Sequence, residues 1–207
     1  PDVDVDEGIE PVKEQPNSNE FAEDLELFKE VLNDEGKIEI TVHSPTIIKT
    51  FAERIYSDYN SAIRELYNNE ARACRMARDQ FHARPKIHIT LNETDRKLII
   101  NGVDSLGIKA NIAAQVLKEI GTSSNHDSNE VGQFGQGFAS YSLLTDAMML
   151  ETNPRLGLEY GLVCDKLTFT PYATLNIPRP NLGYYGTKLE MVLKDDIHFP
   201  SISTLII

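Results

Sequence analysis

The amino-acid sequence predicts an α+β two-layer sandwich, and three observations lead to that fold class. Segments with the apolar spacing of helices come mostly in the first half of the chain, strand-like segments come mostly in the second half, and one hairpin lies between them. The 207 residues include 41% hydrophobic side chains, which is enough for one ordinary globular core. A chain of this length needs no disulfide or metal to stabilise its fold.

The first part of the chain is expected to be an acidic tail followed by helices. Residues 1–19 are acidic, contain prolines and offer few apolar side chains, so we expect a mobile tail before a domain over 20–207. Ser44 and Pro45 are typical of a helix start, as N-cap and first-turn residue. In chain order, we expect a helix over 21–32, a strand over 38–42, and helices over 44–56 and 60–81.

The second part of the chain is expected to be mainly strands. Asn92-Glu93-Thr94-Asp95 favours a turn, which makes the strands on either side a hairpin. Gly121 ends a helix, and the polar stretch after it is long for a compact domain, which indicates a functional loop. In chain order, we expect strands over 87–91 and 97–100, a helix over 111–120, a loop over 122–131, a helix over 135–144, and strands over 148–151, 158–163, 167–172 and 187–193.

Composition argues against several classes of protein. The net charge is −12, and residues 1–36 carry 13 of the 32 acidic residues, which argues against a broad basic surface for nucleic acid. Cys74 and Cys164 form no C-x-x-C pair or Cys/His cluster, so a zinc module and a disulfide scaffold are excluded and a reducing, cytoplasmic setting is favoured. Apolar stretches such as 147–150 are far shorter than the roughly 20 residues of a membrane span, and the acidic N-terminus is unlike a signal peptide. The missing initiator Met and the apolar end at 205–207 suggest a fragment of a longer protein.

Three glycines follow the polar loop and open a predicted helix. Gly132, Gly135 and Gly137 have the spacing G-x-x-G-x-G, which lets backbone N–H groups approach a phosphate at a helix N-terminus. This spacing differs from the Rossmann motif, and the segment lacks the Gly-Lys-Ser/Thr ending of a P-loop. A tight turn alone would also explain these glycines.

Glu65 and Asn69 lie four residues apart and therefore share one face of the helix predicted over 60–81. An Asn oxygen suits Mg²⁺, and a carboxylate one turn away can orient or deprotonate an attacking water. An ordinary solvated helix face would also explain the polar side chains of this region, which are Arg64, Glu65, Asn68, Asn69, Glu70 and Arg72.

Two further motifs lie at the ends of predicted strands. Asp104, after the second hairpin strand, can accept a hydrogen bond from an exocyclic amine such as that of adenine, and Gly107 leaves room for a flat ring. Gly186 and Thr187 open the last predicted strand. An ordinary Asp/Gly turn and a plain strand would explain the same residues.

Taken in order, the segments 64–75, 104–108, 121–138 and 186–196 resemble the GHKL ATPase superfamily, the Bergerat fold. The resemblance covers about residues 45–196. The local sequence is most similar to the N-terminal ATPase domain of the ninety-kilodalton heat-shock chaperones, and it is also similar to the B subunits of type IIB topoisomerases. The resemblance implies that helices cover one face of a mixed, mostly antiparallel sheet.

The resemblance also implies a role for each matching residue. Asn69 would hold Mg²⁺ and Glu65 would activate water, while Asp104 would bind the adenine amine with Thr187 in support. The other nucleotide contacts would come from Gly107, Thr122, Gly132, Gly135, Gly137 and Phe138, with residues 109–131 forming a mobile ATP lid.

The sequence departs from the family pattern at two places. Arg72 stands three residues after Asn69, where the family has Asp, which changes the polar network around the metal. The segment after the hairpin is one residue shorter than the family motif D-x-G-x-G, and alignment on Gly107 would place Val103 at the Asp position. We prefer Asp104 because a valine cannot recognise an amine.

The resemblance implies a domain that binds ATP or ADP with Mg²⁺, hydrolyses ATP slowly and couples the nucleotide to lid closure and homodimer formation in a chaperone-like cycle. A topoisomerase- or MutL-like ATPase that acts on DNA is one alternative. A nucleotide-binding interaction module without turnover is another. The sequence does not specify the client protein or DNA complex, and we expect no membrane partner.

Overall fold

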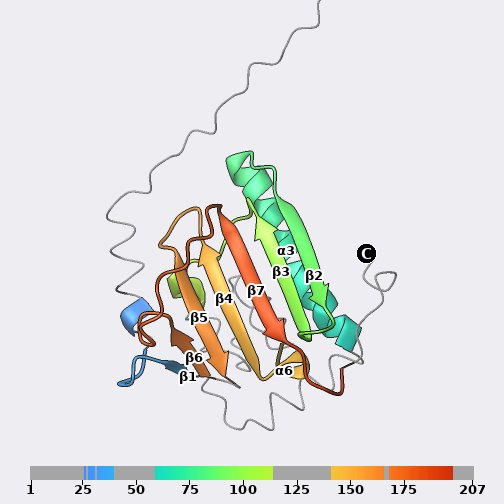
Figure 1. Cartoon of the computed structure of the whole chain (residues 1–207). Helices are drawn as coiled ribbons and strands as arrows, with labels where there is room; N and C mark the ends of the chain where they lie inside the picture. Colours follow the sequence, from blue (N-terminus) through green and yellow to red (C-terminus); the bar gives the residue numbers. More distant parts are fainter. Residues whose placement is uncertain are drawn as a thin grey trace, which may run out of the picture.

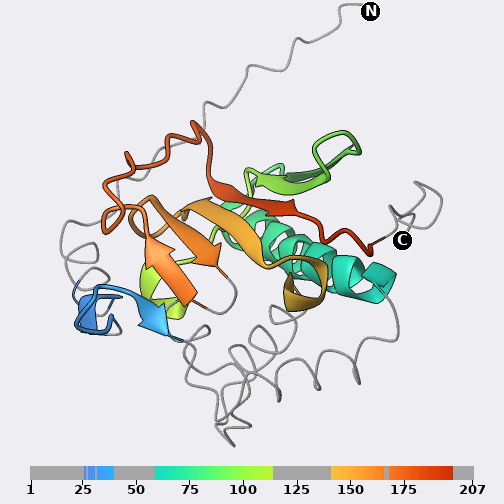
Figure 2. The same cartoon turned by 60° about the horizontal axis from the view of Figure 1, so that its bottom comes forward.

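The computed structural model describes residues 26, 28–30, 32–39, 59–113, 141–165 and 168–197, and these residues form two layers. One layer is a seven-stranded sheet with the strand order β1-β6-β5-β4-β7-β3-β2 (Figure 1). Every strand pairing that the structure describes is antiparallel. The described helices lie on one face of this sheet, so the predicted α+β two-layer sandwich is confirmed (Figure 2).

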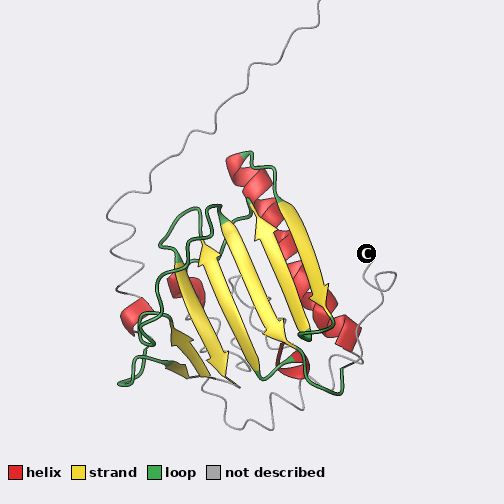
Figure 3. Ribbon diagram, in the orientation of Figure 1, coloured by secondary structure: helices red, strands yellow, loops and turns green. Residues whose placement is uncertain are grey.

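The helices and strands follow the order that the sequence predicts (Figure 3). In chain order, they are β1 (Ile38–Glu39), α3 (Tyr59–Phe81), β2 (Lys86–Asn92), β3 (Lys97–Val103), α6 (Tyr141–Leu144), β4 (Ala147–Asn153), β5 (Tyr160–Asp165), β6 (Thr168–Pro171) and β7 (Gly186–Val192). Residues 28–30 and 110–113 are also helical. The predicted helix over 60–81 and the predicted hairpin are thereby confirmed to within a few residues.

Several predictions fall outside the described residues, in whole or in part. The tail over 1–19, the helix over 44–56 and the loop over 122–131 lie wholly outside them. The helices predicted over 111–120 and 135–144 are described only at one end each, and both of those ends are helical.

Helix α3 packs its apolar face against the sheet beneath β2 and β3 (Figure 1). The buried residues of the helix are Ala62, Ile63, Leu66, Glu70, Ala73, Cys74 and Ala77. After Phe81, His82 has a positive φ of 53°, and the Ala83 N–H donates to the Ala77 carbonyl at 3.4 Å. A residue in the left-handed conformation directly after the last turn is a common form of helix end, and it stops α3 before the hairpin.

Strand β7 comes last among the strands in the sequence but lies between β3 and β4 in the sheet. Its Thr187 pairs with Gly102 of β3 on one side and with Thr152 of β4 on the other. Alternate residues of these strands face the helices and fill the core, among them Leu98, Ile100, Leu150, Leu189 and Met191. The late insertion of β7 therefore brings the two halves of the domain together beside α3.

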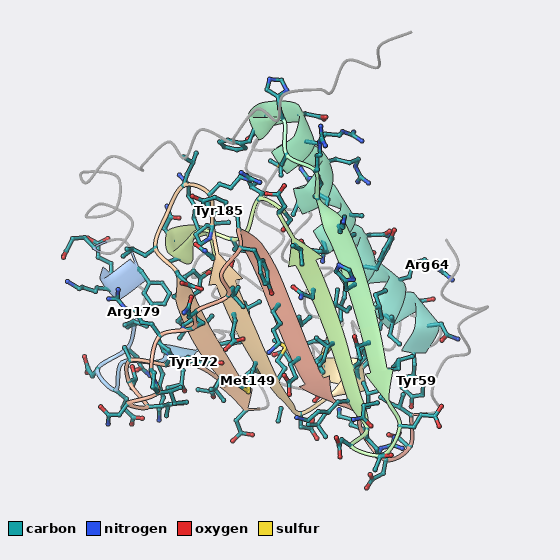
Figure 4. All side chains as sticks on the ribbon, turned by 45° about the horizontal axis from the view of Figure 1, so that its top comes forward. Tyr59, Arg64, Met149, Tyr172, Arg179 and Tyr185 are labelled. Atoms are coloured by element: carbon teal, nitrogen blue, oxygen red, sulfur yellow. The ribbon has the colours of Figure 1, made fainter. Side chains whose placement is uncertain are left out.

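The opposite face of the sheet carries charged side chains. Lys97 Nζ lies 2.7 Å from a Glu190 oxygen, and Lys188 Nζ lies 3.4 Å from oxygens of both Glu151 and Glu190. Met149 of β4 shares this face with Glu151, two residues later on the same strand (Figure 4). The sheet thus separates an apolar core on the side of α3 from a polar surface on the other side.

Candidate functional site

A cavity of about 390 Å³ lies between α3, the centre of the sheet and the segment that follows β3. A volume of this size suits a small-molecule ligand. Its walls are mainly apolar, with side chains such as Leu66 and Ile100. The polar side chains among the described lining residues are Asn69, Glu70, Arg72, Gln80, Lys109 and Thr187.

Two polar side chains of α3 line the cavity and carry buried atoms without a hydrogen-bond partner. These atoms are Asn69 Nδ2, a donor, and Glu70 Oε1, an acceptor. A buried polar atom without a partner costs roughly 1–3 kcal/mol, so folded proteins retain few of them. Both atoms have almost no accessible surface, so Asn69 and Glu70 line the cavity through their other atoms.

Glu70 is a carboxyl group on the buried face of α3, where it is 9% exposed. It occupies the space above Gly102 of β3, since a Cβ on that glycine would lie only 1.7 Å from Glu70 Oε1. Burial disfavours the charged carboxylate and raises the pKa of Glu70 to about 7, while a hydrogen bond with the Ser105 side chain acts in the opposite direction.

The interpretation of Glu70 as part of a solvated helix face is wrong. Glu70 lies four residues after Leu66 and three before Ala73, both of which are buried, so it continues the buried face of the helix. This helical spacing is the sequence feature that indicates burial of residue 70, whereas a charged side chain by itself indicates exposure.

Threonines of two neighbouring strands form a polar floor below the cavity. Thr187 lines the cavity and is 5% exposed. Its Oγ1 lies 3.5 Å from Thr152 Oγ1, which accepts a hydrogen bond from the Ile108 N–H at 3.0 Å and donates one to the Gly186 carbonyl at 3.1 Å. These bonds hold the segment after β3 against β4 and β7.

Gly107 lies in the cavity wall at a backbone position that requires glycine. Its φ is 71°, in the left-handed region, and an added Cβ would lie 2.6 Å from Pro154 Cα. The Arg155 N–H donates to the carbonyl of Leu106 at 3.0 Å, which fixes the same turn to the end of β4. The ligand role predicted for Gly107 stays a prediction, but its place in the cavity wall agrees with it.

Asp104 lies outside the described lining of the cavity, and its carboxylate binds other protein groups. Its Oδ2 accepts a hydrogen bond from the Arg84 N–H at 2.9 Å, and its Oδ1 pairs with Arg155. The Arg155 guanidinium lies 5.4 Å from the ring centroid of Phe81 and 4.9 Å from that of Tyr185, near the start of β7 (Figure 4). The Asp104 carboxylate is therefore already bound to Arg84 and Arg155. Its adenine-binding role stays a prediction.

The other predicted site residues divide into two groups. Glu65 is half-buried on α3, one turn before Asn69, and is not among the described lining residues, so its role in activating water stays a prediction. The predicted ligand residues Thr122, Gly132, Gly135, Gly137 and Phe138 lie outside the described residues, together with 114–131 of the predicted lid.

The predicted magnesium site rests on Asn69. In the described ranges, no three or more His, Cys, Asp or Glu side chains are grouped so that they could hold a metal ion. Mg²⁺ bound with a nucleotide needs only one or two protein oxygens, because phosphates and water fill its other positions. The Asn69 side chain lies at the cavity wall, and its amide oxygen could supply one such ligand.

Part of the chain is similar to a curated chaperone. Over 121 residues it is 31% identical to the chaperone protein HtpG of Rhizobium meliloti (strain 1021). The similar region covers 48% of this chain and 19% of HtpG, so it spans about a fifth of the length of that relative. No protein-family model matches the chain. As far as the structure describes the chain, none of its helices combines the length and apolar character of a membrane span.

Proposed function

We propose that this chain is a GHKL-type ATP-binding domain, and that ATP or ADP binds with Mg²⁺ in the cavity beside α3. The observation that carries the proposal is the meeting of Asn69, Gly107 and Thr187 in the wall of one cavity. These residues come from three separate segments of the chain, and each was singled out from the sequence as a nucleotide or metal contact. The partial similarity to HtpG supports the same assignment.

The residues of the cavity suggest how such a ligand would be held. The flat base would lie between the apolar walls and the threonine floor, with Gly107 leaving space for it. Asn69 would bind the metal ion, whose positive charge neutralises phosphate oxygens. Arg72 and Lys109 also line the cavity and bring positive charge toward anionic phosphates. Glu65, one turn from Asn69, would orient or deprotonate the attacking water.

A chaperone-like cycle is the version that the similarity to HtpG favours. In that version, nucleotide binding closes the lid over 109–131 and promotes association of two copies of the chain. An ATPase that acts on DNA remains the first alternative, and stimulation of hydrolysis by added DNA would favour it. A module that binds but does not hydrolyse ATP is the second, and the position of Glu65 outside the described cavity lining is the observation in its favour.

Thermal unfolding with Mg-ADP tests the proposal directly. A ligand that binds only the folded protein at 100 times its dissociation constant stabilises it by about 2.7 kcal/mol, so the unfolding midpoint should rise with ligand concentration. Magnesium alone and magnesium with pyrophosphate are the controls, because neither offers a base to the cavity. An unchanged midpoint at millimolar Mg-ADP would contradict the proposal.

A further inference from the structure

The exposed side of α3 carries arginines that the proposed function does not use. Arg64, Arg75 and Arg78 are all exposed, and Arg64 lies on the side of the helix away from the strands (Figure 4). A helix has about 3.6 residues per turn, so residues 75 and 78 lie about three and four full turns after Arg64. The three arginines therefore share one face of the helix, which we call the arginine face of α3.

The arginine face has little charge compensation within the described part of the chain. Arg64 and Arg75 form no ion pair with any other described residue. Arg78 pairs with Asp79 at 3.2 Å, but the two side chains are 62% and 66% exposed, and ion pairs in such positions contribute little. Arg75 and Arg78 also repel each other, because they lie three residues apart on the helix. An anionic partner would neutralise this face.

The same chain contains a segment of opposite charge. Residues 1–10 contain five acidic residues and no basic residue. The net charge of the whole chain is −12, so the protein as a whole repels the phosphates of nucleic acid. Charge complementarity therefore favours the acidic segment of the chain itself as the occupant of the arginine face. Its acidic residues are Asp2, Asp4, Asp6, Glu7 and Glu10.

The acidic segment is long enough to reach the arginine face. Phe28, near the start of the described chain, packs against Tyr160 of β5, with ring centroids 5.7 Å apart. Strands β4, β7 and β3 lie between β5 and β2, a separation of about 20 Å across the sheet. The residues before 26 could span up to about 80 Å if extended. The arginine face is about 21 Å long, and an extended stretch over 2–10 would cover about 26 Å.

We propose that residues 1–10 dock on the arginine face of α3 of the same chain, through ion pairs between their carboxylates and Arg64, Arg75 and Arg78. Residues 1–10 lie outside the described residues, so the inference rests on the face that would receive them. It is independent of the proposed function, because none of the three arginines lines the cavity. Docking of this kind weakens as salt increases, since salt screens exposed charges.

Nuclear magnetic resonance with a spin label on the full chain tests this docking. Asn68→Cys places a nitroxide on the same side of α3, four residues after Arg64, where it broadens the amide signals of nearby residues. The native thiols compete little for the label, because burial raises the pKa of Cys74 to about 11 and that of Cys164 to about 12. We expect broadening of residues 2–10 at about 0.01 M salt and its loss at about 1 M salt, where the Debye length is about 3 Å.

Two sets of substitutions in the spin-labelled chain assign the contact. The first set replaces the arginine face with glutamine, and the second replaces the five acidic residues of 1–10 with their amides. The control neutralises three exposed bases elsewhere, through Lys29→Gln, Lys86→Gln and Arg179→Gln. Broadening of residues 2–10 should be lost in the first two proteins and kept in the control. Circular dichroism checks that each protein is folded.

Several results would overturn the proposal. One is the absence of broadening in the wild-type background at low salt, and another is its persistence in a folded protein without the arginine face. A mixture of ¹⁵N-labelled chain without the nitroxide and unlabelled chain with it shows broadening only if the segment docks on a second copy, which would also contradict docking within one chain. Duplex DNA that shifts the signals of α3 and leaves those of residues 2–10 unchanged would identify a different occupant.

Discussion

Gly107 and Gly183 allow the cost of crowding to be separated from the cost of backbone conformation. Both have positive φ, at 71° and 69°. A Cβ at Gly107 would meet the backbone of Asn153 and Pro154, whereas a Cβ at Gly183 would meet nothing within 4 Å. The two positions are therefore matched in conformation and differ in their surroundings.

We expect Gly183→Ala to destabilise the protein by about 1–2 kcal/mol, the cost of a left-handed conformation for a residue with a side chain. Gly107→Ala should cost more, by roughly a further 1–3 kcal/mol for the contact with Pro154, and should weaken ligand binding because the turn lines the cavity. Urea unfolding of both variants measures the difference. Equal losses of stability would mean that the turn at Gly107 relaxes freely.

The burial of Glu70 is a feature that its residue type alone does not predict. Residue type predicts exposure for a glutamate, and only the helix spacing from Leu66 to Ala73 indicates burial. The reason that burial is tolerated lies at Gly102, in another element, where the missing side chain leaves the necessary space. That contact depends on how α3 packs on the sheet, which local patterns do not specify.

The hairpin of β2 and β3 is the element that the sequence predicts best. Its turn residues and the alternation on either side are local features, and the paired residues run from Asn92 and Lys97 outward. The insertion of β7 between β3 and β4 is different, because it pairs residues about 85 positions apart, such as Gly102 with Thr187. The sequence identified both strands without indicating that they are neighbours.

The charged pair across β3 and β7 leads to a prediction about pH. The Lys97 ammonium, helped by Lys188, lowers the pKa of Glu190 below its ordinary value of 4.5. The ion pair therefore stabilises the folded protein above pH 4.5. This contribution is lost as pH falls through the lowered pKa of Glu190 in the folded state. Glu190→Gln should cost up to about 1 kcal/mol at pH 7, because the pair is partly exposed, and nothing once the carboxyl is protonated.

Urea unfolding of wild type and Glu190→Gln across this pH range gives the measurement. Glu93→Gln, in the exposed turn between β2 and β3, serves as the control for removing one negative charge. A stability difference between wild type and Glu190→Gln that does not shrink on acidification would show that Glu190 contributes through packing and not through its charge.

The site belongs to the whole domain, because no single segment of the chain contains it. Helix α3 supplies Asn69 and Glu70, the segment after β3 supplies Gly107, and β7 supplies Thr187. Sequence motifs identified three of these four residues, since each motif has a local pattern of its own. They could not show which side chains line the cavity, and Glu70, which does, was interpreted from the sequence only as part of a polar helix face.

Substitutions at Asn69 and Glu65 separate nucleotide binding from turnover in the assembled protein. If Asn69 holds the metal ion in the ground state, Asn69→Ala should weaken Mg-ATP binding. If Glu65 acts only on the attacking water, Glu65→Ala should bind Mg-ATP normally and lower hydrolysis by roughly 10²- to 10⁴-fold, the usual contribution of a general base. Calorimetry and a phosphate-release assay on the full-length protein report the two quantities independently. Wild-type hydrolysis by Glu65→Ala would remove Glu65 from the catalytic step, and the absence of hydrolysis in the wild type with binding retained would favour the non-hydrolysing module.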